Sequence, residues 1–204
     1  MIKNIFFDFD GVIIDSMPVR EYGFREIFKD YDSTLVDKLI EFHEINGGLS
    51  RFVKIKYFFE KLLNEPISDN AITLYANNFS VLMKKELIKK KYLINETVEY
   101  IQKNYKQYNL HIVSGSEENE LRYLCQELNI DFYFKSIHGS PTHKNILVKD
   151  LLLNYGYKKE QTILIGDSIN DYEAAKNNEL FFYGYNNEML KNKSDFYIDN
   201  FNSI

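Results

Sequence analysis

Residues 4–12 of the chain read NIFFDFDGV, and this stretch indicates how the rest of the molecule is organised. A short run of strand-forming residues leads into two carboxylates, Asp8 and Asp10, and Gly11 then permits a sharp turn. Because side chains two residues apart in an extended strand point the same way, the two carboxylates are expected to project together from the carboxyl end of the strand. Open α/β sheets bind their ligands at that end.

Two interpretations of this stretch stay open on local grounds. Two like charges so close together are costly unless a cation or a shared proton relieves them, which makes Asp8 and Asp10 a candidate metal and acid–base site. Asp-Gly between apolar runs is also the commonest signal for a β-hairpin turn. Residues farther along the chain have to decide between the two.

Composition limits the classes of function. The chain has 204 residues, of which 45% are hydrophobic, enough for one domain with a large insertion or for two small domains. Its net charge of -5 argues against nucleic acid and anionic membrane as partners, and no apolar run is long enough to span a membrane. The single cysteine, Cys125, excludes an internal disulfide and fits a reducing cytosol. We therefore expect a cytoplasmic protein, and the sequence predicts no oligomeric state.

The hydrophobic period changes along the chain and predicts its organisation. From about residue 16 to residue 91, apolar residues recur at helical spacing, with breaks at 46–48 and 64–66. From residue 92 onward, helical segments alternate with short β-rich runs, as in right-handed βαβ units. This pattern predicts an α/β fold: a three-layer, Rossmann-like parallel sheet made by residues 1–15 and 92–204, with a helical bundle of residues 16–91 inserted after the first strand.

The second half of the chain can be divided into elements. Thr142 is the expected cap of one of its helices, and the C-terminal tail is expected to be irregular. Strands are expected at 110–113, near 132–134, at 162–166 and at 180–183; helices are expected at 96–105, from about 117 to 128, from about 142 to 155, and after Asp167.

Polar residues follow four of the predicted strands. Because the carboxyl ends of parallel strands share one edge of a sheet, these residues are expected to converge on one crevice. They are Asp8 and Asp10 after the first strand, Ser114 with Gly115 after the second, Lys144 after the third, and Asp167 with Asp171 after the fourth.

This set of residue types suits phosphoryl transfer. A carboxylate can attack phosphorus to form an acyl phosphate, and a second carboxylic acid can protonate the leaving oxygen and then activate water. Mg²⁺ prefers hard oxygen ligands and screens the repulsion between a carboxylate and a phosphate dianion. A hydroxyl, a lysine and backbone amides can hold the phosphate oxygens.

The same motifs resemble those of a known family, the haloacid dehalogenase superfamily. Residues 6–12 (FFDFDGV) with Asp15-Ser16 resemble its first motif, and residues 163–171 (ILIGDSIND) resemble its fourth. Residues 113–116 (VSGS) look like the second motif, and Lys144, after residues 139–141 (GSP), looks like the third. The inserted helices are similar to the cap of the branch that contains phosphoglycolate phosphatase and β-phosphoglucomutase.

The resemblance implies a role for each residue. Asp8 would be the nucleophile and Asp10 the general acid and base, with the backbone carbonyl of Asp10 on the metal. Lys135 is a competitor for the lysine position, but Lys144 is favoured because it lies beside a helix start. The implied phosphate-binding residues are Ser114, Gly115 and Lys144; the implied Mg²⁺ ligands are Asp8, Asp10, Asp167 and Asp171, the last directly or through water.

The loop at residues 46–51 (NGGLSR) resembles the cap loop that lowers an arginine toward the substrate in sugar-phosphate members of the family. Arg51 is therefore a candidate ligand for a distal carboxylate or second phosphate. The alternative is a turn between helices, capped by Ser50, with a solvated Arg51. Arg20 is a weaker candidate.

The function predicted from these residues is that of a Mg²⁺-dependent phosphatase. It would hydrolyse a small phosphorylated metabolite, a sugar phosphate or a phosphoglycolate-like acid, through an aspartyl-phosphate intermediate. A phosphosugar mutase would use the same catalytic residues, and it stays open as an alternative. A non-catalytic module that accepts a phosphoryl group is a third reading, which the long helical insertion disfavours.

Overall fold

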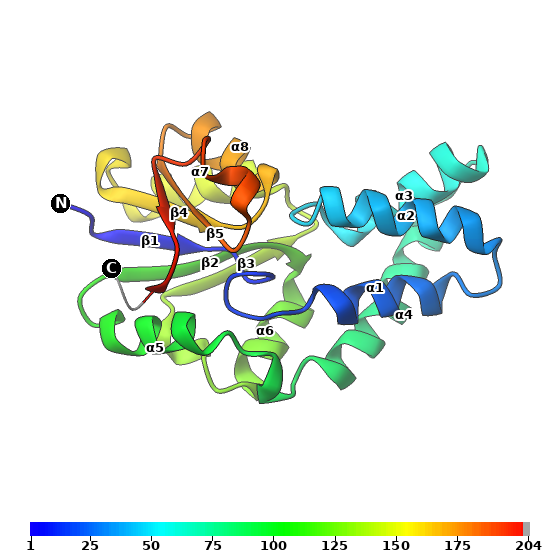
Figure 1. Ribbon diagram of the computed structural model, residues 1–204, viewed down its shortest axis with the longest axis horizontal. Helices are drawn as coiled ribbons and strands as arrows, with labels where there is room; N and C mark the ends of the chain where they lie inside the picture. Colours follow the sequence, from blue (N-terminus) through cyan, green and yellow to red (C-terminus); the bar gives the residue numbers. More distant parts are fainter. Residues whose placement is uncertain (202–204) are drawn as a thin grey trace.

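The fold is taken from a computed structural model, which describes residues 1–201 (Figure 1). Its centre is a six-stranded sheet in the order β3-β2-β1-β4-β5-β6, and all five pairings are parallel. The strands are β1 (Asn4–Phe7), β2 (Asn109–Glu117), β3 (Ser136–Ser140), β4 (Thr162–Gly166), β5 (Phe181–Tyr185) and β6 (Phe196–Ile198).

The strand that carries the first motif, β1, lies inside the sheet between β2 and β4. Phe7 is opposite Ile112 of β2 and Ile165 of β4, so these three strands reach the same edge together. Successive side chains of β1 enter opposite faces: Ile5 and Phe7 belong to one buried cluster and Phe6 to the other. Both faces of the strand are therefore buried.

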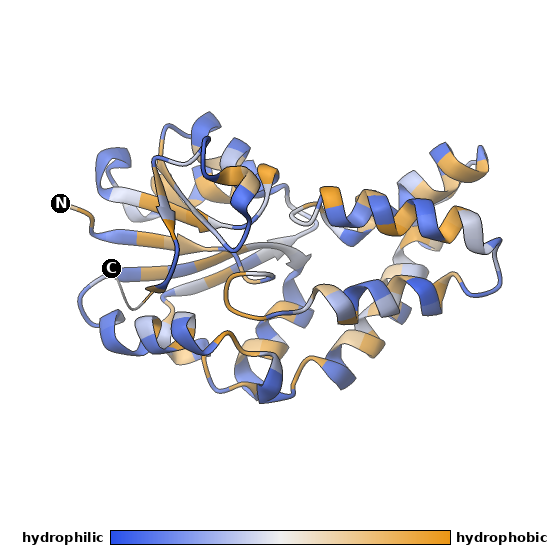
Figure 2. Ribbon diagram, viewed as in Figure 1, coloured by the Kyte–Doolittle hydropathy of each residue, from blue (hydrophilic) through white to orange (hydrophobic). Residues whose placement is uncertain are grey.

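Helices cover both faces of the sheet. α5 (Asn95–Asn104) and α6 (Glu118–Glu127) lie on one side, and α7 (Lys144–Tyr155) and α8 (Ile169–Asn177) lie on the other (Figure 1). Hydrophobic residues concentrate in the strands and on the inward faces of these helices (Figure 2). The predicted three-layer α/β fold is confirmed. We call this part of the molecule the core.

The remaining helices form a bundle, residues 17–86, that projects beyond the carboxyl edge of the sheet (Figure 1). Aromatic residues fill its interior: the rings of Phe24 and Phe79 are 4.6 Å apart, and those of Phe28 and Phe58 are 4.1 Å apart. The bundle consists of α1 (Met17–Ile27), α2 (Ser33–Ile45), α3 (Arg51–Tyr57), a π-helical segment (Phe58–Leu63) and α4 (Asp69–Glu86).

The chain enters and leaves the bundle through two segments that pair with each other. The Asp15 amide donates to the Tyr92 carbonyl at 2.7 Å, and the Ile94 amide donates to the Ile13 carbonyl at 2.9 Å. Ile14 and Leu93 form an isolated antiparallel bridge between these bonds. The two covalent connections between bundle and core are thus joined at one place, a suitable geometry for a hinge.

The strand expected near residues 132–134 is wrong. Those residues belong to a 3₁₀ turn, Asp131–Tyr133, and the strand β3 begins at Ser136, which is paired with His111 of β2. Phe134 is buried against the core whereas Phe132 is 62% exposed, so the aromatic run anchors a turn. The real strand, SIHGS, lies at the edge of the sheet and has one large aliphatic residue, which explains its weak signal.

Two further details differ from the expectation. Helix α7 is capped by His143, whose Nδ1 accepts from the Asn145 amide at 3.3 Å, and Thr142 is not the cap. Part of the tail that was expected to be irregular forms β6, which pairs with β5. Among residues 1–201, no helix is both long and apolar enough to cross a membrane.

Candidate active site

Three carboxylates gather where β1 and β4 end. The Asp8 amide donates to the Ile165 carbonyl at 2.9 Å, which continues the β1–β4 pairing and holds Asp8 beside the loop that follows β4. Carboxylate oxygens of Asp8, Asp167 and Asp171 all lie within 4.8 Å of one another. Asp8 is 2% exposed and Asp171 is fully buried. The topology therefore brings together acids that are more than 150 residues apart in the sequence.

Lys144 lies against this acidic cluster. It is the first residue of α7, it is 4% exposed, and its Nζ lies 2.9 Å from Asp8 Oδ1 while also forming an ion pair with Asp171. The competing lysine, Lys135, is exposed at the start of the β3 edge, where its amide donates to the Leu110 carbonyl. The structure thus brings Lys144 to the predicted site.

One lysine does not neutralise the three carboxylates, of which Asp8 and Asp171 are buried and Asp167 is half-buried. Burial, followed in effect by Asp171, raises the pKa of Asp8 to about 7 even though Lys144 opposes the change. Burial and Asp8 likewise raise the pKa of Asp167 well above its ordinary value. A donor set made only of hard carboxylate oxygens with surplus negative charge fits a divalent cation such as Mg²⁺.

Two glycines leave room for these carboxylates. A Cβ at Gly11 would lie 1.9 Å from Asp167 Oδ2, and a Cβ at Gly166 would lie 2.3 Å from Asp171 Cβ. Asp171 is further held by a capping box, in which its Oδ2 accepts from the Ser168 amide at 3.0 Å and from Ser168 Oγ at 2.6 Å. The cluster is consequently fixed by local backbone geometry as well as by charge.

Asp10 faces a different set of partners from Asp8. Its Oδ1 accepts from Ser16 Oγ and lies 2.5 Å from Arg20 Nε, and its Oδ2 accepts from Ser116 Oγ at 2.6 Å. Burial alone would raise the pKa of Asp10, but Arg20 and the two hydroxyls lower it below the ordinary value. The two aspartates share the sheet edge without pointing the same way, because β1 ends at Phe7 and the chain is already turning at Asp10.

The second motif lies at the same edge and touches the bundle. Ser114 is buried, and its Oγ accepts from the Ser116 amide at 3.1 Å. A Cβ at Gly115 would lie only 2.3 Å from the carbonyl oxygen of Gly48 in the bundle. Gly115 therefore lies where the core and the bundle are in close contact.

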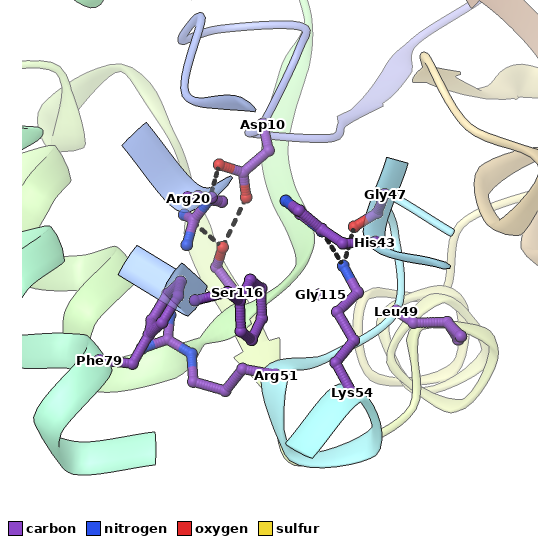
Figure 3. Close-up of a pocket in the computed structure, with 11 residues that line it drawn as sticks. Asp10, Arg20, His43, Gly47, Leu49, Arg51, Lys54, Phe79, Gly115 and Ser116 are labelled. Carbon is purple, nitrogen blue, oxygen red and sulfur yellow. Dashed lines mark hydrogen bonds and ion pairs between the residues drawn. The ribbon is translucent and has the colours of Figure 1, made fainter. Parts of the chain in front are cut away.

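A small cavity separates the two parts of the molecule here (Figure 3). Its volume of about 20 Å³ is enough for one or two water molecules, so a larger group would enter this cavity only if the bundle moved away from the core. The cavity is lined from the core by Asp10, Gly115 and Ser116, and from the bundle by Arg20, Phe24, His43, Gly47, Leu49, Arg51, Lys54 and Phe79.

Residues 5–184 match the family model of the haloacid dehalogenase-like hydrolases. The chain belongs to this family. It is 28% identical, over 223 aligned residues, to a putative ankyrin repeat protein of Acanthamoeba polyphaga mimivirus. The alignment covers 97% of this chain but only 28% of the length of the viral protein. It is 24% identical to a phosphoglycolate phosphatase of Colwellia psychrerythraea, over 89% of this chain and 85% of that one.

The fold is shared with solved structures of low sequence identity. The β-phosphoglucomutase of Clostridium difficile superposes with a TM-score of 0.77 at 17% identity, covering all of this chain and 93% of that one. At this identity the likeness concerns the fold, including the bundle inserted after β1.

In this haloacid dehalogenase-like hydrolase, Arg51 is buried between the core and the bundle. It is 4% exposed, and its guanidinium is bidentate on Glu120, with Nη1–Oε2 at 2.5 Å and Nη2–Oε1 at 2.7 Å. Nη1 also donates to Ser80 Oγ at 2.6 Å, and the group lies 4.6 Å from the ring centre of Phe79. Ser50 caps α3, as the alternative reading expected, but Arg51 is not solvated.

Several residues of the site carry no clear signal in the sequence. Glu120 is fully buried although it lies on the first turn of α6, where a glutamate is normally solvated. Lys54 and His43 also line the cavity and are buried. In the sequence each is a polar residue beside an apolar stripe, which ordinarily marks a solvated helix face. Contacts between segments far apart in the sequence surround them: Glu120 meets Arg51 across the interface, and His43 contacts Phe24 and Lys54 within the bundle.

Proposed function

We propose that the protein is a Mg²⁺-dependent phosphatase that hydrolyses a small phosphorylated metabolite through an aspartyl-phosphate intermediate. One observation carries the proposal: Asp8, at the end of β1, has Lys144 Nζ at 2.9 Å and lies in a carboxylate cluster with Asp167 and Asp171. A nucleophilic carboxylate, a cation for the phosphate and a set of hard oxygen ligands are thus combined in one place.

The residues divide the reaction between them. A carboxylate oxygen of Asp8 attacks phosphorus and the bond from phosphorus to the leaving oxygen breaks. Asp10, in its protonated form, gives that oxygen a proton and becomes ionised. Asp10 then takes a proton from the water that attacks the acyl phosphate, which releases phosphate and regenerates Asp8. Arg20 lowers the pKa of Asp10 and so favours the ionised form that this second step needs.

The phosphate and the metal are held by the remaining residues. Lys144, the Ser114 hydroxyl and the Gly115 amide would bind the oxygens of the transferring phosphate. Bound Mg²⁺ would screen the repulsion between the Asp8 carboxylate and the phosphate. It would be held by carboxylates of Asp8 and Asp167, by the Asp10 carbonyl, and by Asp171 directly or through water.

The helical bundle would act as a cap. Residues 16–91 would open and close on a core of residues 1–15 and 92–204 about the hinge at residues 13–15 and 92–94. Closure would exclude bulk water and large substrates during the transfer. We further propose a cytoplasmic location, as the composition predicts.

Hydrolysis of p-nitrophenyl phosphate tests the proposal. We expect turnover that requires Mg²⁺ and falls by at least about three orders of magnitude in Asp8→Asn, because the nucleophile is lost. Asp150→Asn is the control, since Asp150 is exposed on α7 and belongs neither to the carboxylate cluster nor to the hinge. Turnover that survives Asp8→Asn, or that falls equally in both variants, would contradict the proposal.

A phosphosugar mutase is the second candidate, favoured by the structural likeness to a β-phosphoglucomutase. It would return the phosphoryl group from Asp8 to another oxygen of the sugar. Assaying sugar phosphates for both isomer formation and free phosphate separates the two, because a mutase forms isomer with negligible phosphate release. A single stoichiometric phosphorylation without turnover would instead indicate a non-catalytic phospho-accepting module.

A further inference from the structure

Three cationic side chains of the bundle line the cavity, and they differ in how their charge is compensated. Arg20 is paired with Asp10 at 2.5 Å, and Arg51 is bidentate on Glu120. Lys54 has no ion-pair partner within residues 1–201; its Nζ lies 2.8 Å from His43 Nδ1 and donates to the Gly47 carbonyl at 3.1 Å (Figure 3). Of these three side chains, Lys54 therefore faces the cavity without a carboxylate partner from the part of the chain that the structure describes.

The position of Lys54 is costly in the absence of a ligand. The residue is 2% exposed, and burial, followed in effect by Arg20, lowers its pKa to about 7. A lysine ammonium has three N–H donors, of which His43 and Gly47 use two. A buried ammonium with a spare donor and no anion beside it is rare in a purely structural role.

His43 supplies a second unused donor. Burial, followed by Lys54, lowers its pKa to about 2, so the imidazole is neutral. Because Nδ1 accepts from Lys54, the ring proton is on Nε2, which is buried and has no hydrogen-bond partner in the described part of the chain. In Figure 3 this nitrogen lies on the side of the ring away from Lys54, toward Asp10. The orphaned donor and the spare Lys54 proton belong to the same wall of the cavity.

We propose that Lys54 and His43 together bind a carboxylate in the leaving group of the substrate, and that they make phosphorylated carboxylic acids the preferred substrates. The inference rests on the proposed phosphatase function and narrows its substrate class. A monoanionic carboxylate has two oxygens for the two unused donors, and its charge matches the one uncompensated cation. A phosphate dianion would leave surplus negative charge in a buried site.

Arg51 has a different task in this proposal. An anion that bound Arg51 would have to displace Glu120, which is fully buried and would lose its bidentate partner. Arg51 belongs to the bundle and Glu120 to α6 of the core, so their contact joins the two parts when the bundle is closed. The leaving group then meets Lys54 as the cation that is free to bind it.

Two matched probes test the inference. Phosphoglycolate and 2-hydroxyethyl phosphate both have a two-carbon leaving group. The leaving group of phosphoglycolate carries a carboxylate, whereas that of 2-hydroxyethyl phosphate carries a neutral hydroxyl. We expect the protein to have the higher kcat/KM for phosphoglycolate, chiefly through KM. Lys54→Met should reduce that preference about tenfold or more, as for one lost charge-assisted hydrogen bond, with little change for 2-hydroxyethyl phosphate.

The controls keep the result interpretable. Lys56→Met is the matched control, because Lys56 lies on the same helix with its side chain 55% exposed. His43→Phe keeps the ring that packs 5.0 Å from Phe24 but removes both nitrogens, and it should also weaken the preference for phosphoglycolate. Titration calorimetry of both probes with the Asp8→Asn variant in the presence of Mg²⁺ compares their affinities without turnover.

The outcomes separate this inference from the proposed function. If p-nitrophenyl phosphate is hydrolysed through Asp8 but phosphoglycolate is not preferred, the carboxylate subsite is overturned and the phosphatase stands. Equal losses on both probes in Lys54→Met would reduce Lys54 to a structural role and overturn the inference. So would an Arg51→Met variant that loses the preference while Lys54→Met keeps it.

Discussion

At the scale of single residues, the chemistry depends on the burial of Asp8 and on the carboxylates beside it. Its ordinary pKa of 3.8 is raised to about 7 by burial and by Asp171. Between these two values the folded protein holds more protons than the unfolded chain, so this carboxyl makes the free energy of unfolding fall as pH rises. A divalent cation in the cluster would stabilise the ionised form of Asp8 against both burial and the repulsion from Asp171.

The pH dependence of metal stabilisation follows. We expect Mg²⁺ to raise the thermal midpoint more at about pH 8, where Asp8 must ionise, than at about pH 5, where it is protonated. Thermal unfolding with Mg²⁺ and with a chelator at both pH values measures the difference. Asp8→Asn, which has no titrating group at this position, should show a smaller difference. An Mg²⁺ effect that is equal at both pH values would contradict this account.

At the scale of elements, the bundle meets the core through glycine. The carboxyl end of β2 and the loop between α2 and α3 approach so closely that a Cβ at Gly115 would lie 2.3 Å from the Gly48 carbonyl oxygen. Backbone lies on both sides of this contact, so a side chain at Gly115 has no flexible neighbour to displace. A methyl group there would hold the bundle away from the core.

Gly115→Ala should therefore impair closure while leaving the elements intact. We expect kcat/KM for phosphoglycolate to fall on the order of 100-fold, because the groups of the bundle no longer reach the leaving group. The loss for p-nitrophenyl phosphate should be smaller. Gly47→Ala is the control, since no atom of residues 1–201 lies within 4 Å of a Cβ at Gly47. The account is wrong if the two variants behave alike.

At the scale of the whole molecule, one buried carboxylate joins the bundle to the core. Glu120 is bidentate on Arg51 and lies 3.4 Å from Arg20 Nη1, so both of its partners come from the bundle. Removing one member of a buried ion pair leaves the other without compensation, whereas replacing both with apolar residues is often neutral. Removing Arg51 or Glu120 alone should therefore lower the free energy of unfolding more than replacing both residues together.

Glu120→Gln is expected to lower the free energy of unfolding by about 3 kcal/mol, and Arg51→Met combined with Glu120→Leu should recover most of it. Urea denaturation followed by circular dichroism measures both. Glu127→Gln on the same helix is the control, because Glu127 is exposed and should change stability by less than about 0.5 kcal/mol. A double variant as unstable as Glu120→Gln would refute the pairing argument.

Much of the fold was predictable because its signals are local. The apolar run at residues 162–166 and the helical period of residues 16–91 are visible without a structure, and both correspond to observed elements. The edge strand β3 was not predicted, because a strand at the edge of a sheet needs few hydrophobic residues. Its sequence, SIHGS, therefore lacks the hydrophobic pattern of a strand. The strand was predicted instead at the aromatic residues 132–134, just before β3.

By itself, the sequence determined the order of elements and the acids that follow β1 and β4, because strand period, glycine turns and helix caps are set by neighbouring residues. Tertiary structure alone decided which charges are compensated. Arg51 and Lys54 are both cations of one helix, yet the contact of the bundle with α6 gives Arg51 a carboxylate and, among the described residues 1–201, leaves Lys54 without one. The physical reason is that burial and electrostatic pairing depend on distances between segments far apart in the chain, about which local pattern carries no information.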